Sequence, residues 1–568
     1  MLMRPLTNKS GSTAFRGSDH RIHLPVRKYI AEKILIVMSV LLMMIITSSC
    51  RNPSGKFSDE PQQIPDSTFY TDYIKSDPKL ADQLHWVKLF YRERKYQLAW
   101  FKDNKILPQA EKLLDVISKA ADEGLDPADY RLSDPDKLFK ELKASKKDFD
   151  RFTEVQRELD VSLTATYFLW ASDYYRGVVV PDEHKEIEWD VKQNKIRLDL
   201  ALMTVLGEKK SRYPYAGFSP VHPEYSRLKK ALADYRKVQK AGGWPLIAAS
   251  PRLKPGQTSA VVPVLRKRLG MEETSDSVYT TDIFNAVKQF QTNQGLNPDG
   301  RLDTETVRIM NVPVQDRIRQ IIVNMERWRW IPQSFEPDYL IVNIPEYKLY
   351  VYEKGKIVLS MNVIVGKAIN STPVFSDRME YIVLSPYWNV PFSIIKEELA
   401  PKIAGNPSYL DRLDMEVVNA EGEQINPSSI NWNTLTESNW EYTLRRRPGP
   451  KNDLGDVKFI FPNSNDIYLH DTPHDQLFSQ AKRGFSHGCV RVEKPIELAE
   501  YLLRNSDDWN RARLLSTIAE RKEKKVKLPA PLPVYLVYFT ALADENGRVH
   551  FRDDIYGHDK TLEEHYFK

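Results

Sequence analysis

The hydrophobic period of this 568-residue chain changes at Tyr339, and this change constrains the fold more than any other sequence feature. Before it, apolar residues recur at helical spacing, as they do in 111–120. After it, the period becomes that of β-strands, and segments 339–344 and 348–352 are predicted to be the two arms of a β-hairpin. A chain of this length exceeds one hydrophobic core, so we predict a multidomain α+β protein.

The strand pattern continues after the hairpin but is interrupted by about sixty residues. Alternating segments recur at 356–365 and 381–384 and return at 457–461. The polar stretch between them, 391–447, shows loop and helical fragments and directly precedes the reactive strand. We therefore predict a capping insertion that acts as a lid, and the alternative is an insertion that only packs on the domain.

The first 49 residues hold seven Lys/Arg and two Asp/Glu, which accounts for the whole formal net charge of +5. The remainder is neutral, so the chain lacks the domain-wide basic surface of nucleic-acid-binding proteins. Residues 34–46 form an apolar run after Lys28 and Lys33, as in a signal peptide. Small residues precede Cys50, so we predict a lipoprotein lipidated at Cys50 on the periplasmic side, with a cleaved signal or an uncleaved anchor as alternatives.

Residues 253–313 have the pattern of a compact three-helix unit. Helices are expected at 260–269, 282–294 and 304–310, and Gly295 follows the second as a C-terminal stop. The simplest alternative to a binding role is a helical spacer that binds nothing.

The candidate reactive residues lie in segment 485–492, where Cys489 follows His487 and Gly488. Cysteine is intrinsically nucleophilic, and a histidine elsewhere in the chain can serve as its base. We favour His470 because it ends a strand-like run, whereas His487 stands two residues from the thiol, where the two side chains of one strand would share a face. The backbone N–H groups of Gly488 and Cys489 are candidate oxyanion donors, and Arg491 is placed to hold a thiolate or a carboxylate.

Two other interpretations of this region compete with a catalytic role. A lone buried cysteine in an exported protein is usually inert. A zinc site could use His470, His487 and Cys489 with Asp471 or His474 as a fourth ligand, but structural zinc sites generally have closer, paired spacing. Asp471 either orients His470 or caps a turn.

His470, followed after sixteen residues by His487-Gly488-Cys489 with Ser486 before them, resembles the signature of the L,D-transpeptidases of the YkuD type. Segment 447–459 resembles the same family, and 286–306 resembles its three-helix peptidoglycan-binding module. The resemblance extends over most of the chain from about residue 66 and is greatest for the large branch of the family. The implied N-terminal half comprises a signal peptide (1–49), a tether (50–65), a helical scaffold domain (66–250) and a peptidoglycan-binding domain (251–313). A connecting helix (314–337) then leads to a β-rich catalytic domain (338–515), which contains the capping insertion (391–447). A C-terminal extension (516–568) is expected to pack on the catalytic domain.

The resemblance implies an enzyme that forms 3→3 cross-links between peptidoglycan stem peptides, with release of D-alanine. Its implied nucleophile is Cys489 and its general base His470, with His487, Gly488 and Arg491 supporting the site. The remaining candidates for substrate contact are Tyr468, Asp471 and Ser486. No metal or cofactor is implied, and the expected partners are stem peptides, glycan and the membrane, in the cell envelope. The alternatives are a carboxypeptidase or amidase with the same acyl-enzyme, and a wall-binding lipoprotein without catalytic activity.

Overall fold

The computed structural model describes residues 63–191, 197–207, 222–248, 252–332 and 335–567. The predicted signal peptide, the lipidation site at Cys50 and most of the tether lie outside these residues. In the part of the chain that is described, no helix is both long and apolar enough to cross a membrane.

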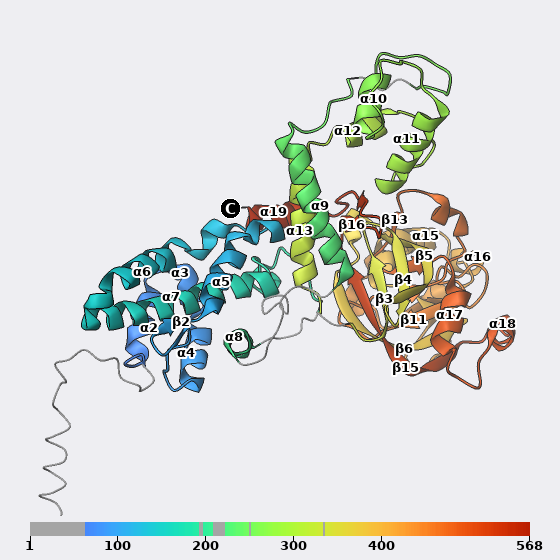
Figure 1. The fold of residues 1–568 in the computed structure, drawn as a ribbon. Coiled ribbons are helices and arrows are strands. Elements are labelled where there is room, and N and C mark those ends of the chain that lie inside the picture. Colours follow the sequence, from blue (N-terminus) through green and yellow to red (C-terminus); the bar gives the residue numbers. More distant parts are fainter. Residues whose placement is uncertain (1–62, 192–196, 208–221, 249–251, 333–334, 568) are drawn as a thin grey trace, which may run out of the picture. The chain divides into compact units, whose positions relative to one another are not determined.

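The N-terminal region is helical and packs around one long helix, α7 (Phe149–Arg176), as Figure 1 shows in blue. Asp148 caps this helix by accepting a hydrogen bond from the Arg151 N–H, and the helix ends at Gly177, whose φ of +95° suits glycine. Every residue from Leu159 to Ala171 is buried, so α7 is the centre of this core. The surrounding helices are α2 (Ser67–Lys75), α3 (Pro78–Ala81), α4 (Leu84–Glu93), α5 (Pro108–Ser118), α6 (Ser133–Ala144) and α8 (Leu198–Leu206).

Two further helices, α9 (Pro223–Lys240) and α13 (Val314–Arg329), run side by side, and the three-helix module lies between them in the chain (Figure 1). The module consists of α10 (Val262–Arg268), α11 (Thr281–Asn293) and α12 (Thr304–Met310), close to the predicted bounds. It has its own small core, in which Ile283 and Val287 of α11 are fully buried.

The C-terminal region is built on a nine-stranded sheet in the order β13-β5-β14-β12-β11-β6-β15-β3-β4. An additional pairing between β4 and β5 closes eight of these strands into a ring. The predicted hairpin is confirmed as β3 and β4, which pair antiparallel. The strands are β3 (Asp338–Asn343), β4 (Lys348–Glu353), β5 (Lys356–Gly366), β6 (Phe375–Leu384), β11 (Val457–Ile460), β12 (Leu469–His470), β13 (Gly484–Ser486), β14 (Val490–Val492) and β15 (Lys524–Val537).

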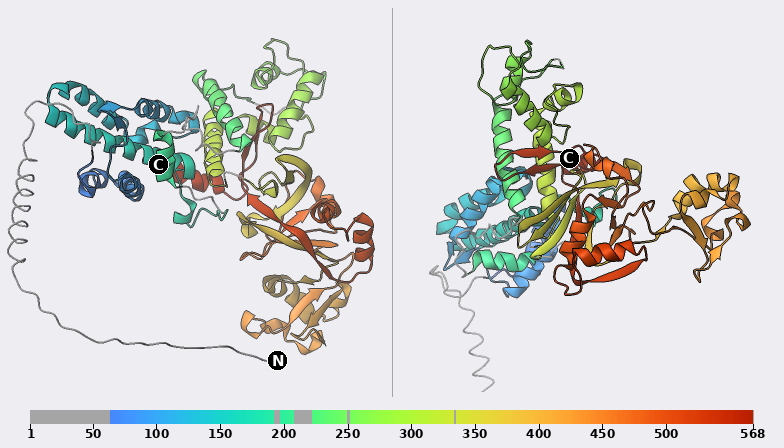
Figure 2. Two further views of the ribbon diagram at one scale, coloured as in Figure 1. Left: turned by 60° about the horizontal axis from the view of Figure 1, so that its bottom comes forward. Right: turned by 90° about the vertical axis from the view of Figure 1, so that its right-hand side faces the viewer.

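The insertion is more regular than its sequence indicated. It forms a separate four-stranded sheet in the order β7-β10-β8-β9 and has its own hydrophobic core, seen as the orange lobe in Figure 2. Its elements are β7 (Trp388–Asn389), α15 (Ala400–Gly405), α16 (Tyr409–Arg412), β8 (Met415–Val418), β9 (Gln424–Ile425) and β10 (Thr443–Arg446).

The prediction of 516–568 as an extension packed on the catalytic domain is wrong for its first half. Strand β15 lies inside the sheet, parallel to β3 and antiparallel to β6. Prolines at 529, 531 and 533 obscured this strand because proline cannot donate to a ladder. The structure accommodates them with a register shift between Lys527 and Leu532. Helices α17 (Pro495–Leu503) and α18 (Arg511–Ala519) precede β15 in the chain, and β16 (Ala541–Ala543), β17 (Val549–Phe551) and α19 (His558–Tyr566) follow it.

Helix α13 carries two buried charges that tie it to the N-terminal region. Glu326 accepts hydrogen bonds from the Val179 N–H (2.9 Å) and from Arg329 Nη1 (2.9 Å), and both charged side chains are fully buried. Arg329 Nη2 donates in turn to the Glu123 carbonyl (2.6 Å) and to the Tyr225 hydroxyl (3.0 Å). The pair therefore links α13 with three separate segments of the helical region.

Replacing Glu326 with alanine should destabilise the protein by about 3–5 kcal/mol, because Arg329 keeps a buried charge without its carboxylate. Urea unfolding followed by circular dichroism measures the effect. Asp115→Ala is the matched control, since its pair with Lys119 is more than 60% exposed on both sides and should contribute under about 1 kcal/mol. Equal unfolding midpoints for the two variants would contradict this account.

Candidate active site

The candidate site is formed by the alternation of side chains on three adjacent strands. In β11, β12 and β14 every second residue enters the hydrophobic core, and the intervening residues face the other way. The core positions are Val457, Phe459, Leu469, Val490 and Val492. The opposite face carries the ionisable side chains of Lys458, His470 and Arg491.

Strand register brings these three side chains into one row. His470 is opposite Lys458 in the antiparallel β11–β12 pair and opposite Arg491 in the parallel β12–β14 pair. Paired positions share a face of the sheet. Neighbouring residues on one face of a strand are two positions apart in the chain. Cys489 is therefore the neighbour of Arg491 on this face, and Tyr468 is the neighbour of His470. The fold therefore gathers Cys489, His470, Tyr468 and Arg491, although the chain separates them by up to 23 positions.

The loop that presents Cys489 is held by Ser486. The Ser486 hydroxyl donates to the Cys489 carbonyl (2.5 Å) and accepts from the Gly488 N–H (3.2 Å), and its side chain is buried. Gly488 lies at φ +117°, a conformation that suits glycine. Ser486 was expected to contact substrate, but the structure uses both its hydrogen-bonding roles within the loop.

The structure of this loop differs from the prediction that the Gly488 N–H is a free oxyanion donor and from the prediction that His487 shares a strand with Cys489. The Gly488 N–H is engaged by Ser486, whereas the Cys489 N–H has no acceptor within the described residues. His487 does not share a strand with Cys489, because β13 ends at Ser486 and β14 begins at Val490. Its Nε2 lies 3.2 Å from Glu398 Oε1, so it contacts the insertion instead.

His470 is buried and neutral. Its Nδ1 lies 2.5 Å from the carbonyl oxygen of Asp471, which can only accept, so Nδ1 carries the proton and Nε2 is left as the basic nitrogen. Burial first, and then the positive charges of Arg491 and Lys458, lower the pKa of His470 to about 3. The ring is therefore poised to accept a proton, which is the role predicted for it from the sequence, and does not supply a positive charge to the thiol.

The thiol of Cys489 is also neutral at rest. Burial raises its pKa, while hydrogen bonds with the backbone and side chain of Tyr468 and the charge of Lys458 act to lower it. Its Sγ lies 3.9 Å from the carbonyl oxygen of Asp466, and among the described residues no hydrogen bond joins it to the His470 ring.

Asp471 positions the imidazole through its backbone and not through its carboxylate. The carboxylate accepts hydrogen bonds from the N–H groups of Asp456 (2.7 Å) and Thr472 (2.7 Å). It fits because Gly455, at φ +60°, has no side chain; a Cβ there would lie 2.3 Å from the Asp471 carboxyl carbon. Burial raises the pKa of Asp471 to about 6. The expected substrate contact at Asp471 is replaced by this structural role.

Lys458 is a site residue that the sequence did not reveal. Its Nζ lies 3.7 Å from the centre of the Tyr468 ring, and burial lowers its pKa. A single lysine between apolar residues looks like the solvent-facing position of an ordinary strand. Only the pairing of β11 with β12 shows that this position faces His470.

Arg491 provides a cation without a bound partner. Its Nε is buried without a hydrogen-bond acceptor, and no ion pair to its guanidinium occurs in the described part of the chain. Burial lowers its pKa, against the attraction of Asp453 and Cys489. An anion that enters the site would satisfy this group.

Three family models match successive parts of the chain. Residues 85–232 match "Scaffold domain", residues 266–310 match "Putative peptidoglycan binding domain", and residues 337–522 match "L,D-transpeptidase catalytic domain". These matches confirm the predicted fold class of a helical region, a peptidoglycan-binding module and a β-rich domain.

A protein of Haemophilus influenzae named "Putative L,D-transpeptidase" is 36% identical over 244 residues, which are 43% of this chain and 49% of that protein. The match thus spans about half the length of the curated relative. Solved L,D-transpeptidase structures from Xylanimonas cellulosilytica (16% identity, 51% of this chain, 98% of that one, TM-score 0.17) and Stackebrandtia nassauensis (12%, 51%, 97%, 0.19) are also similar.

Lys458→Met should raise the pKa of Cys489, because it removes a positive charge that favours the thiolate. We expect alkylation of Cys489 by iodoacetamide at pH 8 to slow about three- to tenfold, measured by mass spectrometry of the Cys489 peptide. Lys458→Arg retains the charge and should stay close to wild type. An unchanged rate in Lys458→Met would exclude this role of Lys458.

Proposed function

We propose that this chain, which carries a catalytic domain of the L,D-transpeptidase family, cross-links peptidoglycan stem peptides by acyl transfer through Cys489. The observation that supports this most directly is the row formed by strand register, in which His470 lies next to Arg491 and one step from Cys489. A buried neutral imidazole beside a thiol is the arrangement that general-base activation of a nucleophile requires.

The first half-reaction transfers the stem to the enzyme. His470 Nε2 takes the thiol proton as Sγ attacks the carbonyl carbon of the third stem residue, a meso-diamino acid. The carbonyl oxygen becomes an oxyanion, to which the Cys489 N–H, unengaged among the described residues, can donate a hydrogen bond. The tetrahedral intermediate then expels D-alanine, whose nitrogen takes the proton from His470, and a thioester remains.

The second half-reaction transfers the acyl group to a neighbouring stem. The side-chain amine of that stem's third residue attacks the thioester carbon while His470 accepts a proton from it. The C–S bond breaks, the thiolate recovers a proton from His470, and a 3→3 amide bond joins the two stems. No metal or cofactor takes part in this scheme.

The charged groups around the thiol support these steps. Lys458 and Arg491 both lower the basicity of His470, so the ring returns its proton readily to the leaving amine. The same cations stabilise negative charge on sulfur. Arg491 is also available to a carboxylate of the meso-diamino acid, and Glu398 of the insertion reaches the site through His487.

The peptidoglycan-acting domains indicate a location in the cell envelope. We propose that the chain is exported to the periplasm and anchored there through Cys50, with stem peptides and glycan as its partners.

A carbapenem should acylate Cys489 and add its mass to the intact protein, since the β-lactam carbonyl replaces the stem carbonyl at the thiol. Intact-protein mass spectrometry measures the adduct. Cys489→Ala should show no adduct while its circular dichroism spectrum remains that of wild type. An adduct on Cys489→Ala, or none on wild type, would refute the assignment of the nucleophile.

Incubation with disaccharide tetrapeptides should yield dimers linked through two third residues, and His470→Gln should slow their formation at least about 100-fold, because it removes the base. Liquid chromatography with mass spectrometry separates the products. Tripeptide monomers without dimers would instead assign a carboxypeptidase, and unchanged substrate would assign a wall-binding protein without catalysis.

A further inference from the structure

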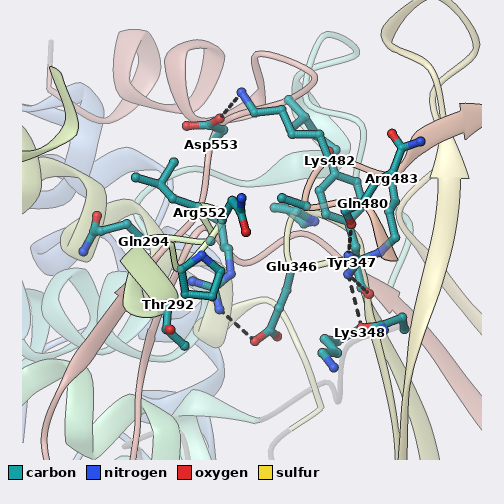
Figure 3. A pocket seen from close by; sticks show the side chains of 18 of the residues that line it. Thr292, Gln294, Glu346, Tyr347, Lys348, Gln480, Lys482, Arg483, Arg552 and Asp553 are labelled. Carbon is teal, nitrogen blue, oxygen red and sulfur yellow. Dashed lines mark hydrogen bonds and ion pairs between the residues drawn. The ribbon is translucent and has the colours of Figure 1, made fainter. Parts of the chain in front are cut away.

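A cavity of about 840 Å³ lies where the peptidoglycan-binding module meets the catalytic domain (Figure 3). The module contributes the end of α11 and the loop after it, including Thr292 and Gln294. The catalytic domain contributes the turn between β3 and β4 and the segment 478–483. A cavity of this size accepts a ligand larger than a single sugar or amino acid.

Most charges that line the cavity are already neutralised. Arg552 pairs with Glu346 (3.3 Å), and Lys482 pairs with Asp553 (3.0 Å), as the dashed lines in Figure 3 show. Arg483 donates to backbone carbonyls, including that of Tyr347 (3.0 Å).

Lys348 differs from these charged residues because its ammonium forms no ion pair among the described residues. No carboxylate lies within ion-pair distance of its ammonium in the described residues, and burial first, then Arg483, lowers its pKa against the more distant Glu346 and Glu493. A half-buried ammonium without a paired carboxylate favours binding of an anion.

The cavity continues toward the nucleophile. Tyr347 and Lys482 also line a second cavity of about 370 Å³, which extends to Gly484 and Phe485 of β13, directly before the Cys489 loop. Strand register sets the span: Lys348 is opposite Asn362 of β5, and Ser486 is opposite Gly366, four residues along the same strand. Four strand residues cover about 13 Å, which an extended tetrapeptide can match.

Register also places Lys348 on the same face as the thiol. Lys348 is opposite Asn362 of β5, and Arg491 is opposite Ile364, two residues further along that strand. Residues two apart on a strand lie on the same face, so Lys348 and Arg491 share a face of the sheet. Cys489, two residues before Arg491, belongs to that face as well. A ligand could therefore reach from Lys348 to Cys489 without crossing the sheet.

We propose that this cavity is a binding subsite for the acidic stem peptide and that Lys348 is its anion anchor. Stem peptides carry free carboxylates, and the module beside the cavity would hold the attached glycan. The subsite rests on the proposed function, because it positions the donor stem for attack by Cys489. It makes Lys348 a residue that determines substrate affinity and leaves the chemical step to the Cys489 face.

The test measures binding of a purified disaccharide tetrapeptide by isothermal titration calorimetry, in the full chain with Cys489→Ala so that no turnover occurs. Adding Lys348→Met should weaken binding at least tenfold, and adding Lys348→Arg should leave it within about threefold. Lys237→Met is the matched control, since this exposed lysine of α9 lies outside both cavities, and it should leave binding unchanged. Binding within twofold of the parent in the Lys348→Met protein, with its circular dichroism unchanged, would overturn the subsite.

A second measurement separates the subsite from the proposed function. With Cys489 present, Lys348→Met should raise KM for the disaccharide tetrapeptide about tenfold while the carbapenem acylation rate stays at the wild-type value. If wild type forms no product but binding still depends on Lys348, the subsite stands and the transpeptidase assignment fails. If dimers form and KM does not respond to Lys348, the transpeptidase stands and the subsite fails.

Discussion

The pairing of β12 with β11 on one side and β14 on the other is the interaction on which the candidate site depends. Only two residues of β12 take part, yet they fix Leu469 in the core and His470 on the opposite face. A shift of one residue would exchange the two faces and bury the chemistry in the apolar core. The ring closure through β4 and β5, and the insertion of β15 between β3 and β6, hold this register from both sides.

The electrostatics of the site follow from the same arrangement. Burial and the two neighbouring cations keep His470 neutral, with Nε2 free to accept a proton, while the positive charges act on the thiol and on entering anions. This differs from a resting thiolate–imidazolium pair, because burial disfavours both charged forms at once. In the proposed mechanism the nucleophile is generated only when proton transfer begins, and a neutral resting thiol is less reactive than a thiolate.

Other contacts connect the catalytic face with the rest of the chain. The buried Glu326–Arg329 pair fixes α13 to the helical region, and Arg552 joins the C-terminal segment both to Glu346 and to the Asn293 carbonyl at the end of α11. The cavity beside Lys348 thus has walls from two domains whose mutual contacts are hydrogen-bonded.

Local sequence was sufficient for the features that depend on neighbouring residues. Helical spacing predicted α11 and α12, alternation predicted the β3–β4 hairpin, and a histidine, a glycine and a lone cysteine in sequence marked the reactive loop. It could not reveal Lys458, the structural roles of Ser486 and Asp471, or the place of β15, because each depends on which strand pairs with which, and prolines concealed β15 altogether. The sequence by itself determined which residues carry the chemistry; strand register and burial, which are properties of the assembled sheet, decided which of them meet and in what charge state.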